Sequence, residues 1–412
     1  MEHTDRSLRH LAFFEALAAM DETQDEWRAT SAGLVVLRLF DAWVDEGPSV
    51  VAADAWGLRA VREAVTSVGA GTPVRRILDG IVDAMEQARD VDIALVAPRL
   101  MAYGRALDFE GRWSLARDVF RTLVQHAHPV EDNDLAADAN MQLAYCARML
   151  GDLEEATAAY RRAEDVARSA GDVVKLLRAT IGDAKVALDK GNFPGAESIL
   201  DGAIANAERE GLTEVRATAL HDRADVALRR GDFELAIRLG YEALQGFTSP
   251  SARDRVLGDI AGAFLELGVR SAARDAYVLL AATATEQYVR WTSTINLLEI
   301  ATLDRCEPVF EQYRRELATA TLPPMLEAYF HLYVGRGYHA FGKDALARDA
   351  YERALAAAAR HSFHKLTFDV EAGLAELGRR STEQAAPETR TPEPLREVAR
   401  AITRMRAVAG VR

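Results

Sequence analysis

A short phrase repeats along this chain at nearly constant spacing, and that period constrains the fold more than any other feature. The phrase starts with glycine, has alanine five positions later, and begins at Gly111, Gly151, Gly191, Gly231, Gly268 and Gly342. The first four glycines are evenly spaced, the fifth follows after a slightly shorter step, and the sixth follows after twice that shorter step. One degenerate unit is therefore expected near Asp304 and Arg305. A period of about 40 residues indicates a repeat protein in which each unit is one supersecondary element.

The residues around each glycine predict a pair of antiparallel helices. A small residue stands seven positions before the glycine and a larger, mostly apolar one nine positions after it, as Ala144 and Tyr160 do around Gly151. The small side chain lets the second helix approach closely, and glycine adopts the left-handed conformation that ends the first helix. One hairpin cannot bury its apolar face alone, so neighbours stack. We therefore predict an all-α fold, a right-handed superhelix (α-solenoid) of helical hairpins.

This arrangement resembles the tetratricopeptide repeat. The small–Gly–Ala–aromatic–Ala positions of that family are matched by Ala144, Gly151, Ala156, Tyr160 and Ala163, and the resemblance covers about residues 96–378. The usual period of the family is about 34 residues, so the longer repeats here lengthen each helix by up to about one turn. The resemblance implies a binding scaffold that holds a protein or peptide segment in its concave face.

The N-terminal part departs from the repeat. Residues 1–95 are predicted to form an N-terminal helical bundle with a degenerate repeat at Gly71, and its helices are expected at Ser7–Met20, Gln24–Asp45, Ser49–Val68 and Pro73–Arg89. Pro48 and Pro73 suit the first turn of a helix. The core of this bundle is expected to contain Trp27, Trp43 and Trp56. The repeat solenoid then occupies residues 96–380, with six clear repeats and one degenerate one.

The C-terminal part also changes character. Residues 381–394 are polar and rich in proline, which predicts a flexible linker. Residues 395–412 are predicted to form a short basic amphipathic helix, because apolar residues and arginines fall on different sides at helical spacing. We expect a partner-docking helix, docked on this chain or on another protein through Leu395, Arg396, Arg400, Ile402 and Arg404.

Composition excludes several classes of protein. The net charge of −13 argues against a nucleic-acid partner. No apolar run reaches the length of about 18 residues that marks a membrane-span candidate, and the first residues lack the features of a signal peptide. Arginine outnumbers lysine 45 to 5, which is typical of a GC-rich bacterial genome. We expect a cytoplasmic location, and the oligomeric state stays open.

The sequence contains no convincing enzymatic motif. It has neither a phosphate-binding loop nor a metalloprotease His-Glu pair. Cys146 and Cys306 are far apart and lack the companions that a disulfide framework or a zinc site requires. His361 and His364 are spaced for one helix face, but a third metal ligand is missing. No catalytic residue, metal site or cofactor is therefore predicted.

The positions that inform function lie on the first helix of each hairpin. In proteins with tetratricopeptide repeats, groove-facing positions fall ten, six and three positions before the glycine, and here these are Met101, Arg105, Asp108, Met141, Tyr145, Arg148, Ile181, Lys185, Leu188, His221, Asp225, Leu228, Leu332, Arg336 and His339. The predicted ligand- or peptide-binding groove consists of Arg105, Tyr145, Arg148, Lys185, His221, Asp225, Arg336 and His339. Basic and aromatic side chains predominate, so a segment with acids and apolar anchors is the expected ligand. The alternative is a neutral helical surface.

Two comparisons within the resemblance refine this expectation. Chaperone-binding tetratricopeptide domains clamp a terminal carboxylate with lysine and asparagine, but the matching positions here hold Met141, Tyr145, Ile181 and Lys185. The architecture is also similar to Rap-like peptide-binding regulators, which have an N-terminal helical bundle and repeats close in length to those found here. Those receptors line the groove with asparagines, and this chain has only Asn140 and Asn296 near the groove positions.

These observations predict a non-enzymatic, regulatory scaffold or adaptor that binds a protein or peptide. Two alternatives stay open within binding proteins: a ligand-sensing module that acts on a transcription or signalling partner, and a structural subunit of a larger assembly. An enzyme with an unrecognised pocket in the N-terminal bundle is the alternative from a different class.

Overall fold

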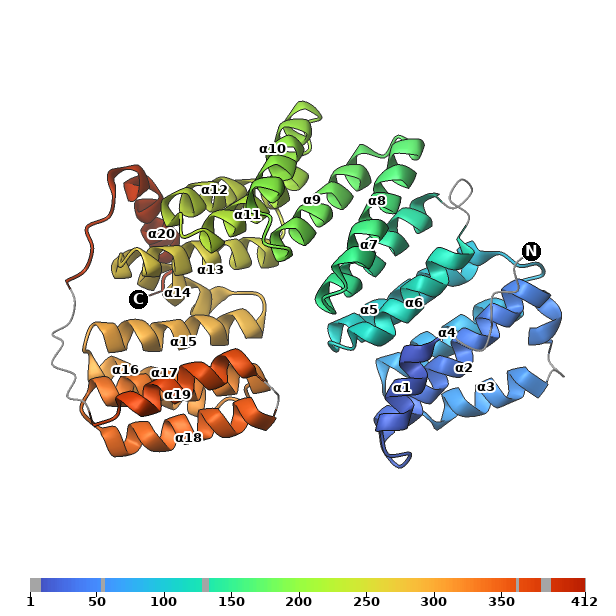
Figure 1. Ribbon diagram of the computed structural model, residues 1–412, viewed down its shortest axis with the longest axis horizontal. Coiled ribbons are helices and arrows are strands. Elements are labelled where there is room, and N and C mark those ends of the chain that lie inside the picture. Colours follow the sequence, from blue (N-terminus) through green and yellow to red (C-terminus); the bar gives the residue numbers. More distant parts are fainter. Residues whose placement is uncertain (1–8, 53–55, 128–132, 361–362, 379–386, 412) are drawn as a thin grey trace. The chain divides into compact units, whose positions relative to one another are not determined.

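The computed structural model describes all residues except 1–8, 53–55, 128–132, 361–362, 379–386 and 412. Every regular element in this described part is a helix (Figure 1). The predicted all-α class is therefore confirmed. The chain divides into two compact units, Met1–Ala207 and Glu208–Arg412, and each is described by itself.

The first unit contains a helical N-terminal part followed by hairpins. Its elements are α1 (Leu11–Ala19), α2 (Asp25–Glu46), the 3-10 helix η2 (Pro48–Val51), α3 (Trp56–Ser67), α4 (Pro73–Gln87), α5 (Ile93–Phe109), α6 (Trp113–His126), α7 (Asn133–Met149), α8 (Leu153–Ala170), α9 (Val173–Asp189) and most of α10 (Phe193–Arg209). Sequential helices pack on one another from α4 to α9, and α2 also packs on α3, α4 and α6. The short α1 lies against α2 and α6.

Three predictions for the N-terminal part differ from the structure in detail. The expected helix Ser49–Val68 begins instead as the 3-10 helix η2, and α3 starts only at Trp56. Gly71 is absent from the glycines with positive φ, so it does not form the turn seen in the true repeats. Trp43 is fully buried, whereas Trp27 is only half-buried, and the side chain of Trp56 lies outside the described residues.

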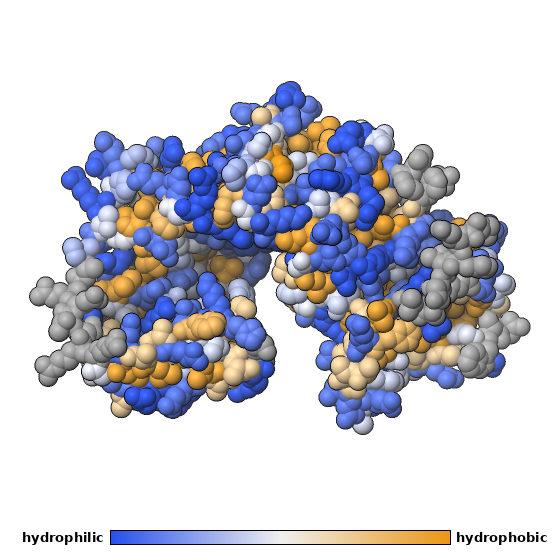
Figure 2. All heavy atoms as spheres, viewed as in Figure 1, coloured by the Kyte–Doolittle hydropathy of each residue, from blue (hydrophilic) through white to orange (hydrophobic). Residues whose placement is uncertain are grey.

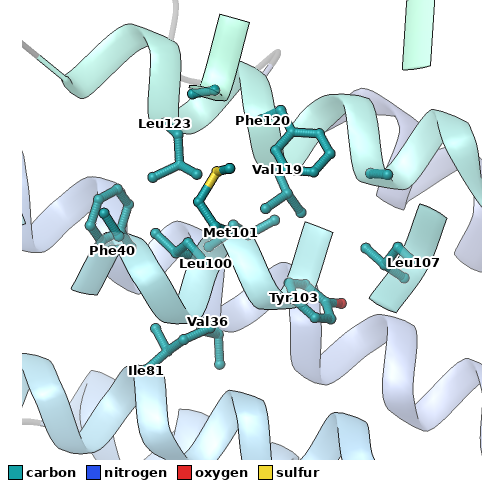
Figure 3. Packing of buried hydrophobic residues seen from close by; sticks show 14 of the residues in the cluster. Val36, Phe40, Ile81, Leu100, Met101, Tyr103, Leu107, Val119, Phe120 and Leu123 are labelled. Atoms are coloured by element: carbon teal, nitrogen blue, oxygen red, sulfur yellow. The ribbon is translucent and has the colours of Figure 1, made fainter. Parts of the chain in front are cut away.

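The core of the first unit continues from the N-terminal helices into the hairpins. Phe40 from α2, Ile81 from α4, Leu100 from α5 and Phe120 from α6 are fully buried in one apolar cluster. Figure 3 shows these side chains together with Met101, which is almost completely buried in the same cluster. The N-terminal helices are thus bound to the first hairpin by a shared core.

A buried carboxylate holds α1 in place. Asp41 of α2 contacts the Nε2 atoms of His10 and His126 at 3.1 and 2.9 Å, and Arg9 lies 3.3 Å away. Burial alone would raise the pKa of Asp41, but the contacts with His10 and His126 outweigh burial and hold that pKa well below its ordinary range. The backbone N–H of Ala12 also donates to the second buried carboxylate, that of Asp118, at 3.1 Å.

The second unit consists of stacked hairpins and a C-terminal helix. Its elements are α11 (Thr213–Arg229), α12 (Phe233–Gly246), α13 (Pro250–Glu266), α14 (Arg270–Thr283), α15 (Gln287–Leu303), α16 (Glu307–Ala318), α17 (Pro324–Ala340), α18 (Asp344–Arg360), α19 (His364–Glu376), the 3-10 helix η3 (Glu393–Leu395) and α20 (Arg396–Val408). First helices of neighbouring hairpins also touch, since α13 packs on α15 and α15 packs on α17. On the face that Figure 2 shows, hydrophilic residues predominate, with apolar patches between them.

The turns fall where the repeat phrase predicts them. All six phrase glycines have φ between 74° and 79°, the left-handed region that glycine adopts without steric cost. The degenerate unit is also present, because α15 ends and α16 begins around Arg305, whose φ is 55°. The prediction of helical hairpins with turns at these positions is therefore confirmed.

The contacts inside hairpins follow the predicted pairing of small and large residues. A Cβ atom placed on Gly104 would lie 2.6 Å from the ring of Phe120, and one on Gly335 would lie 2.5 Å from the ring of Tyr351. Only glycine permits so close an approach of the second helix. Tyr160 likewise reaches the next hairpin, where a Cβ on Gly182 would be 2.2 Å from its ring.

The C-terminal helix docks on this chain's own repeats. α20 packs on α14 and, to a smaller extent, on α12 (Figure 1). Leu395 and Ile402 are fully buried there. Arg406 contacts the Asp275 carboxylate at 2.6 Å, and the segment before α20 is tied down where the backbone N–H of Thr389 donates to the carbonyl oxygen of Gly268 at 3.1 Å.

Candidate binding pocket

The principal pocket of the second unit lies between first helices of successive hairpins. Its volume is about 500 Å³, and its wall combines residues of α11, α13 and α15 with Tyr277 of α14. This is within the range of about 300–1,000 Å³ that is usual for ligand sites. The stacking of the hairpins brings these helices together, although their residues are far apart in sequence.

The polar groups at the rim are held by specific partners. The His221 Nε2 atom lies 2.7 Å from the Asp259 carboxylate, and the His221 ring meets the Phe247 ring edge to face with centroids 6.3 Å apart. The backbone N–H of Thr285 donates to Asp254 at 2.8 Å. Two of the carboxylates that line the pocket are therefore already engaged, and the rim is preorganised.

Two glycines of α13 create the room for the pocket. Gly258 and Gly262 are one turn apart in the wall, and both lie inside a helix, where glycine is less favourable than alanine by about 0.5–1 kcal/mol. The nearest atom to a Cβ on Gly258 would be Leu280 Cδ1 at 3.9 Å, and on Gly262 it would be the Tyr277 hydroxyl at 3.5 Å. Packing therefore does not require glycine at either position, in contrast to Gly104 and Gly335.

Aromatic and amide side chains supply the remaining wall. Burial raises the pKa of Tyr277 further above neutrality, and its protonated hydroxyl can donate a hydrogen bond. Tyr288 is about half exposed at 48 % and offers an aromatic face, while Ser293 is buried. Asn296 adds an amide that can donate to and accept from a peptide group. These residues suit a peptide ligand that places an apolar side chain in the pocket while its backbone forms hydrogen bonds with the wall.

Of the four predicted groove residues in the second unit, the pocket contains one. His221 lines it, but Asp225 pairs with Arg229 one turn along the same helix at 3.3 Å. His339 contacts Asp344 of the following helix at 2.9 Å, so its side chain is engaged at the hairpin turn.

Arg336, the fourth of these residues, takes part in a cluster next to the pocket helices. Its guanidinium lies 5.2 Å from the ring centroid of Tyr333. Burial raises the pKa of the Glu299 carboxyl, and the positive charge of Arg336 opposes that rise. The cluster thus joins α15 to α17 and leaves Arg336 only partly available to a ligand.

In the first unit, two predicted groove residues form one cluster. The Arg148 guanidinium lies 5.6 Å from the Tyr145 ring centroid and contacts Asp189 of α9 at 2.8 Å. Lys185 is half-buried on α9, and Arg105 is exposed on α5. The proposal that all eight residues line one continuous groove extends over both units and stays a prediction.

Several mapped positions face the interior instead of a groove. Met101, Ile181, Leu188 and Leu332 are all less than a tenth exposed. Asn140 is buried as well, where its amide donates to the carbonyl oxygen of Ala136 and its oxygen accepts from Arg162. These expectations were wrong, because in these repeats Met101, Ile181 and Leu332, ten positions before the glycine, and Leu188, three positions before it, pack into the hairpin stack. Of the two asparagines, Asn296 reaches the pocket.

The residues of the predicted partner-docking helix fall into two groups, one buried against this chain and one exposed. Leu395 and Ile402 pack on the chain's own helices, so in this conformation they do not meet a partner. Arg400 and Arg404 are exposed, and the Arg396 side chain is 41 % exposed. A partner role for these arginines stays a prediction.

A solved structure with a similar fold supports the repeat architecture. The chain is similar to the apo form of RapI, with 12% identity, a TM-score of 0.50, and coverage of 80% of this chain and 99% of that one. The Rap conjugation gene regulator of the plasmid pLS20 in complex with the Phr* peptide gives 12% identity, a TM-score of 0.49, and coverage of 82% and 97%. No protein-family model and no curated protein sequence matches the chain. The fold of the chain is therefore similar to that of helical repeat proteins.

A third similar structure comes from the same repeat class. A putative kinesin light chain of Podospora anserina with nearly identical tetratricopeptide-like repeats has 16% identity, a TM-score of 0.34, and coverage of 43% of this chain and 90% of that one. At these identities the likeness to the tetratricopeptide-like proteins concerns the fold alone.

Sequence reasoning missed the pocket, although the signal was present. The same spacing rule applied to the tetratricopeptide-like repeat at Gly268 selects Gly258 and Gly262, ten and six positions earlier. Both line the pocket. Two groove positions without side chains mark a hollow, and that is how the site could have been found.

Two other properties of the described residues concern metal-ligand groups and membrane spans. Within them, no group of three or more His, Cys, Asp or Glu residues is placed to hold a metal ion. His361, half of the histidine pair considered as a metal site, lies outside the described residues. None of the described helices combines the length and the hydropathy that a bilayer span requires.

Proposed function

We propose that this chain is a non-enzymatic scaffold that binds a peptide or protein segment, with the pocket between α11, α13 and α15 as its main anchor site. The observation that carries the proposal is the pair Gly258 and Gly262, which keep the pocket open at a cost in helix stability. Because glycine has no side chain, two glycines on successive turns of a helix in the pocket wall leave room for a ligand.

The chemistry of the wall indicates how a segment would bind. An apolar side chain would occupy the hollow above the two glycines, against Tyr277 and Tyr288. The amide of Asn296 would pair with the backbone of the segment, as an amide can donate and accept at once. The ligand backbone would therefore lie along the first helices, with one apolar anchor in the pocket.

We also propose that the rest of the bound segment carries acidic residues. This part of the proposal is based on Arg105, Lys185 and Arg336, which outnumber the acid Asp225 among the predicted groove residues. Arginine pairs well with carboxylates because two N–H groups can donate in parallel. Arg148 contributes less, since its guanidinium is already bound to Asp189.

A regulatory role in the bacterial cytoplasm completes the proposal. The pLS20 Rap regulator is in complex with the Phr* peptide, but the proposal for this chain is based on its own pocket. A ligand-sensing module is the second candidate, favoured by the pocket volume of about 500 Å³, which also fits a small molecule.

Selection of peptides followed by a pocket-filling substitution tests the proposal. Peptides are selected from a random display library on the full chain, and their dissociation constants are measured by fluorescence anisotropy. Gly262→Leu places a side chain in the pocket, where only the Tyr277 hydroxyl lies within reach of its Cβ, at 3.5 Å. We expect this variant to bind at least about tenfold more weakly, a loss of about 1.4 kcal/mol.

The matched control is Gly202→Leu. Gly202 is an exposed glycine of α10, and a Cβ there would have no atom within 4 Å. Its affinity for the selected peptides should be unchanged. If both variants bind as the original chain does, or if selection yields no peptide, the pocket is not a peptide site.

A further inference from the structure

The exposed side of α20 carries a row of positive charges. Arg396, Arg400 and Arg404 follow one another at every fourth position, and we name these three the basic face of α20. Residues at this spacing lie on one side of a helix, each about 6 Å from the last along the axis. The chain as a whole has a net charge of −13, so this face opposes the overall charge.

The basic face borders a hollow with donor groups and no acid in its wall. The hollow has a volume of about 440 Å³ and is lined by Thr391, Arg396, Ala399, Arg400, Thr403 and Arg404. The nearest carboxylate contact is that of Glu393 with Arg396 at 3.8 Å, and Glu393 is 86 % exposed. An exposed ion pair at this distance contributes little to stability, so Arg396 can exchange Glu393 for another carboxylate.

Neighbouring charges are engaged elsewhere. The Asp275 carboxylate of α14 binds Arg406 at 2.6 Å on one oxygen and accepts from the Thr403 hydroxyl at 2.6 Å on the other. On α14, Arg270 and Arg274 both pair with Asp304. No acid from α14 is therefore directed at the basic face.

Docking of α20 makes this face rigid. Its apolar side is fixed by the buried residues Leu395, Val398, Ala401 and Ile402, and its end by the contact between Arg406 and Asp275. A free amphipathic peptide of this length is marginally helical in water. Because docking holds the helix, the three guanidinium groups are presented at fixed spacing before any partner arrives.

We propose that the basic face of α20 docks an acidic helical segment of a partner protein, with carboxylates at every fourth position. Carboxylates at that spacing lie on one side of a helix and match the interval between the arginines, so the two helices can pair along their length. This surface is separate from the pocket between α11, α13 and α15, and the proposal does not depend on that pocket.

The number of arginines favours a protein segment over other anions. Nucleic-acid binding usually draws on about 6–10 phosphate contacts, and anionic membranes usually attract clusters of about 4–8 basic residues. The basic face supplies three. A short row of carboxylates needs no more than three.

The test uses three labelled peptides built from alanine and glutamine. One carries four glutamates at every fourth position, the second carries four glutamates at every second position, and the third has glutamine in their place. Binding to the full chain is followed by fluorescence anisotropy at low and moderate salt. We expect the first peptide to bind at least tenfold more tightly than the second, and the third not to bind.

Two charge-reversed variants localise the interaction. R400E/R404E should lower the affinity for the first peptide at least tenfold, because it reverses two exposed charges without touching the buried side of α20. The control is R353E/R360E, which makes the same charge change on the exposed side of α18. It should change the affinity less than twofold.

Several outcomes would overturn the proposal. Equal binding of the two glutamate peptides, or equal losses in both double variants, would mean that attraction is general and not specific to α20. Absence of binding at low salt would contradict it directly. Tighter binding of a short DNA duplex than of the first peptide, lost in R400E/R404E, would assign this face to nucleic acid.

Discussion

Replacement of glycine by alanine should have opposite effects at two helical positions in the second unit. At Gly258, an added Cβ would meet only Leu280 Cδ1 at 3.9 Å, which is ordinary van der Waals contact. Alanine is more favourable than glycine inside a helix by about 0.5–1 kcal/mol. Gly258→Ala should therefore raise the free energy of unfolding by about that amount.

At Gly335 the same change meets a packed ring. An added Cβ would lie 2.5 Å from Tyr351, a side chain that is 2 % exposed and has no room to withdraw. Overpacking of this kind costs about 1–3 kcal/mol, and the gain in helix propensity offsets about 0.5–1 kcal/mol of it. Gly335→Ala should lower the free energy of unfolding by up to about 2.5 kcal/mol.

Thermal unfolding of the full chain, followed by far-ultraviolet circular dichroism, distinguishes the two effects. For a unit of this size, about 1 kcal/mol corresponds to about 2–4 °C in the melting temperature. The transition of Gly258→Ala should rise by about 1–4 °C, and that of Gly335→Ala should fall. If Gly258→Ala also melts at a lower temperature, α13 is tightly packed at that point and the pocket described here is not open.

Three further outcomes can be measured. The folded pKa of Asp41 is depressed, so its contribution to stability is present above the unfolded pKa of about 3.8 and is lost as the pH falls towards the folded pKa. Asp41→Asn should therefore lower the free energy of unfolding by about 1.5–3 kcal/mol near neutral pH, measured by urea unfolding. The variant should also lose less stability than the original chain when the pH is lowered below about 3.8. Changing Tyr145 and Arg148 together to alanine should weaken a peptide selected on the chain by on the order of 2 kcal/mol in anisotropy titrations if they belong to the binding groove, and an unchanged dissociation constant would remove them from it. Deleting residues 381–412 should preserve the helical circular dichroism of the hairpins but lower the melting temperature by several degrees, because burial of each large apolar side chain of the docked helix contributes about 1.5–3 kcal/mol to the free energy of unfolding. An unchanged melting temperature would mean that the helix is not docked in solution.

The sequence predicted the hairpins well because their determinants are local. A turn that needs positive φ selects glycine, and a close helix contact selects a small residue opposite an aromatic one, as Gly335 and Tyr351 do. Both requirements recur at fixed offsets, so they are visible as a period. Even Arg305, which replaces glycine at one turn, could be located from the spacing alone.

The binding surface was harder to predict because it depends on how hairpins stack. Whether a side chain faces a groove or the next hairpin is decided by the rotation of one helix against its neighbours, and Met101 shows the result, since it is buried in the core. Which acid a charged side chain pairs with also depends on contacts between helices and cannot be inferred from the local sequence. His339 and Arg148 have the residue types of a binding site, but they pair with Asp344 and Asp189 of the chain itself.

The docking of α20 has a consequence for how the protein is made. Arg406 follows its partner Asp275 by 131 residues, and a ribosome adds about 5–20 residues each second. The faces of α12 and α14 that α20 covers therefore stay bare for on the order of ten seconds of synthesis, whereas each hairpin closes within a few seconds of its first helix. During that interval the nascent chain displays an apolar stripe that a chaperone can bind, and any message truncated before Leu395 yields a protein that keeps the stripe uncovered permanently.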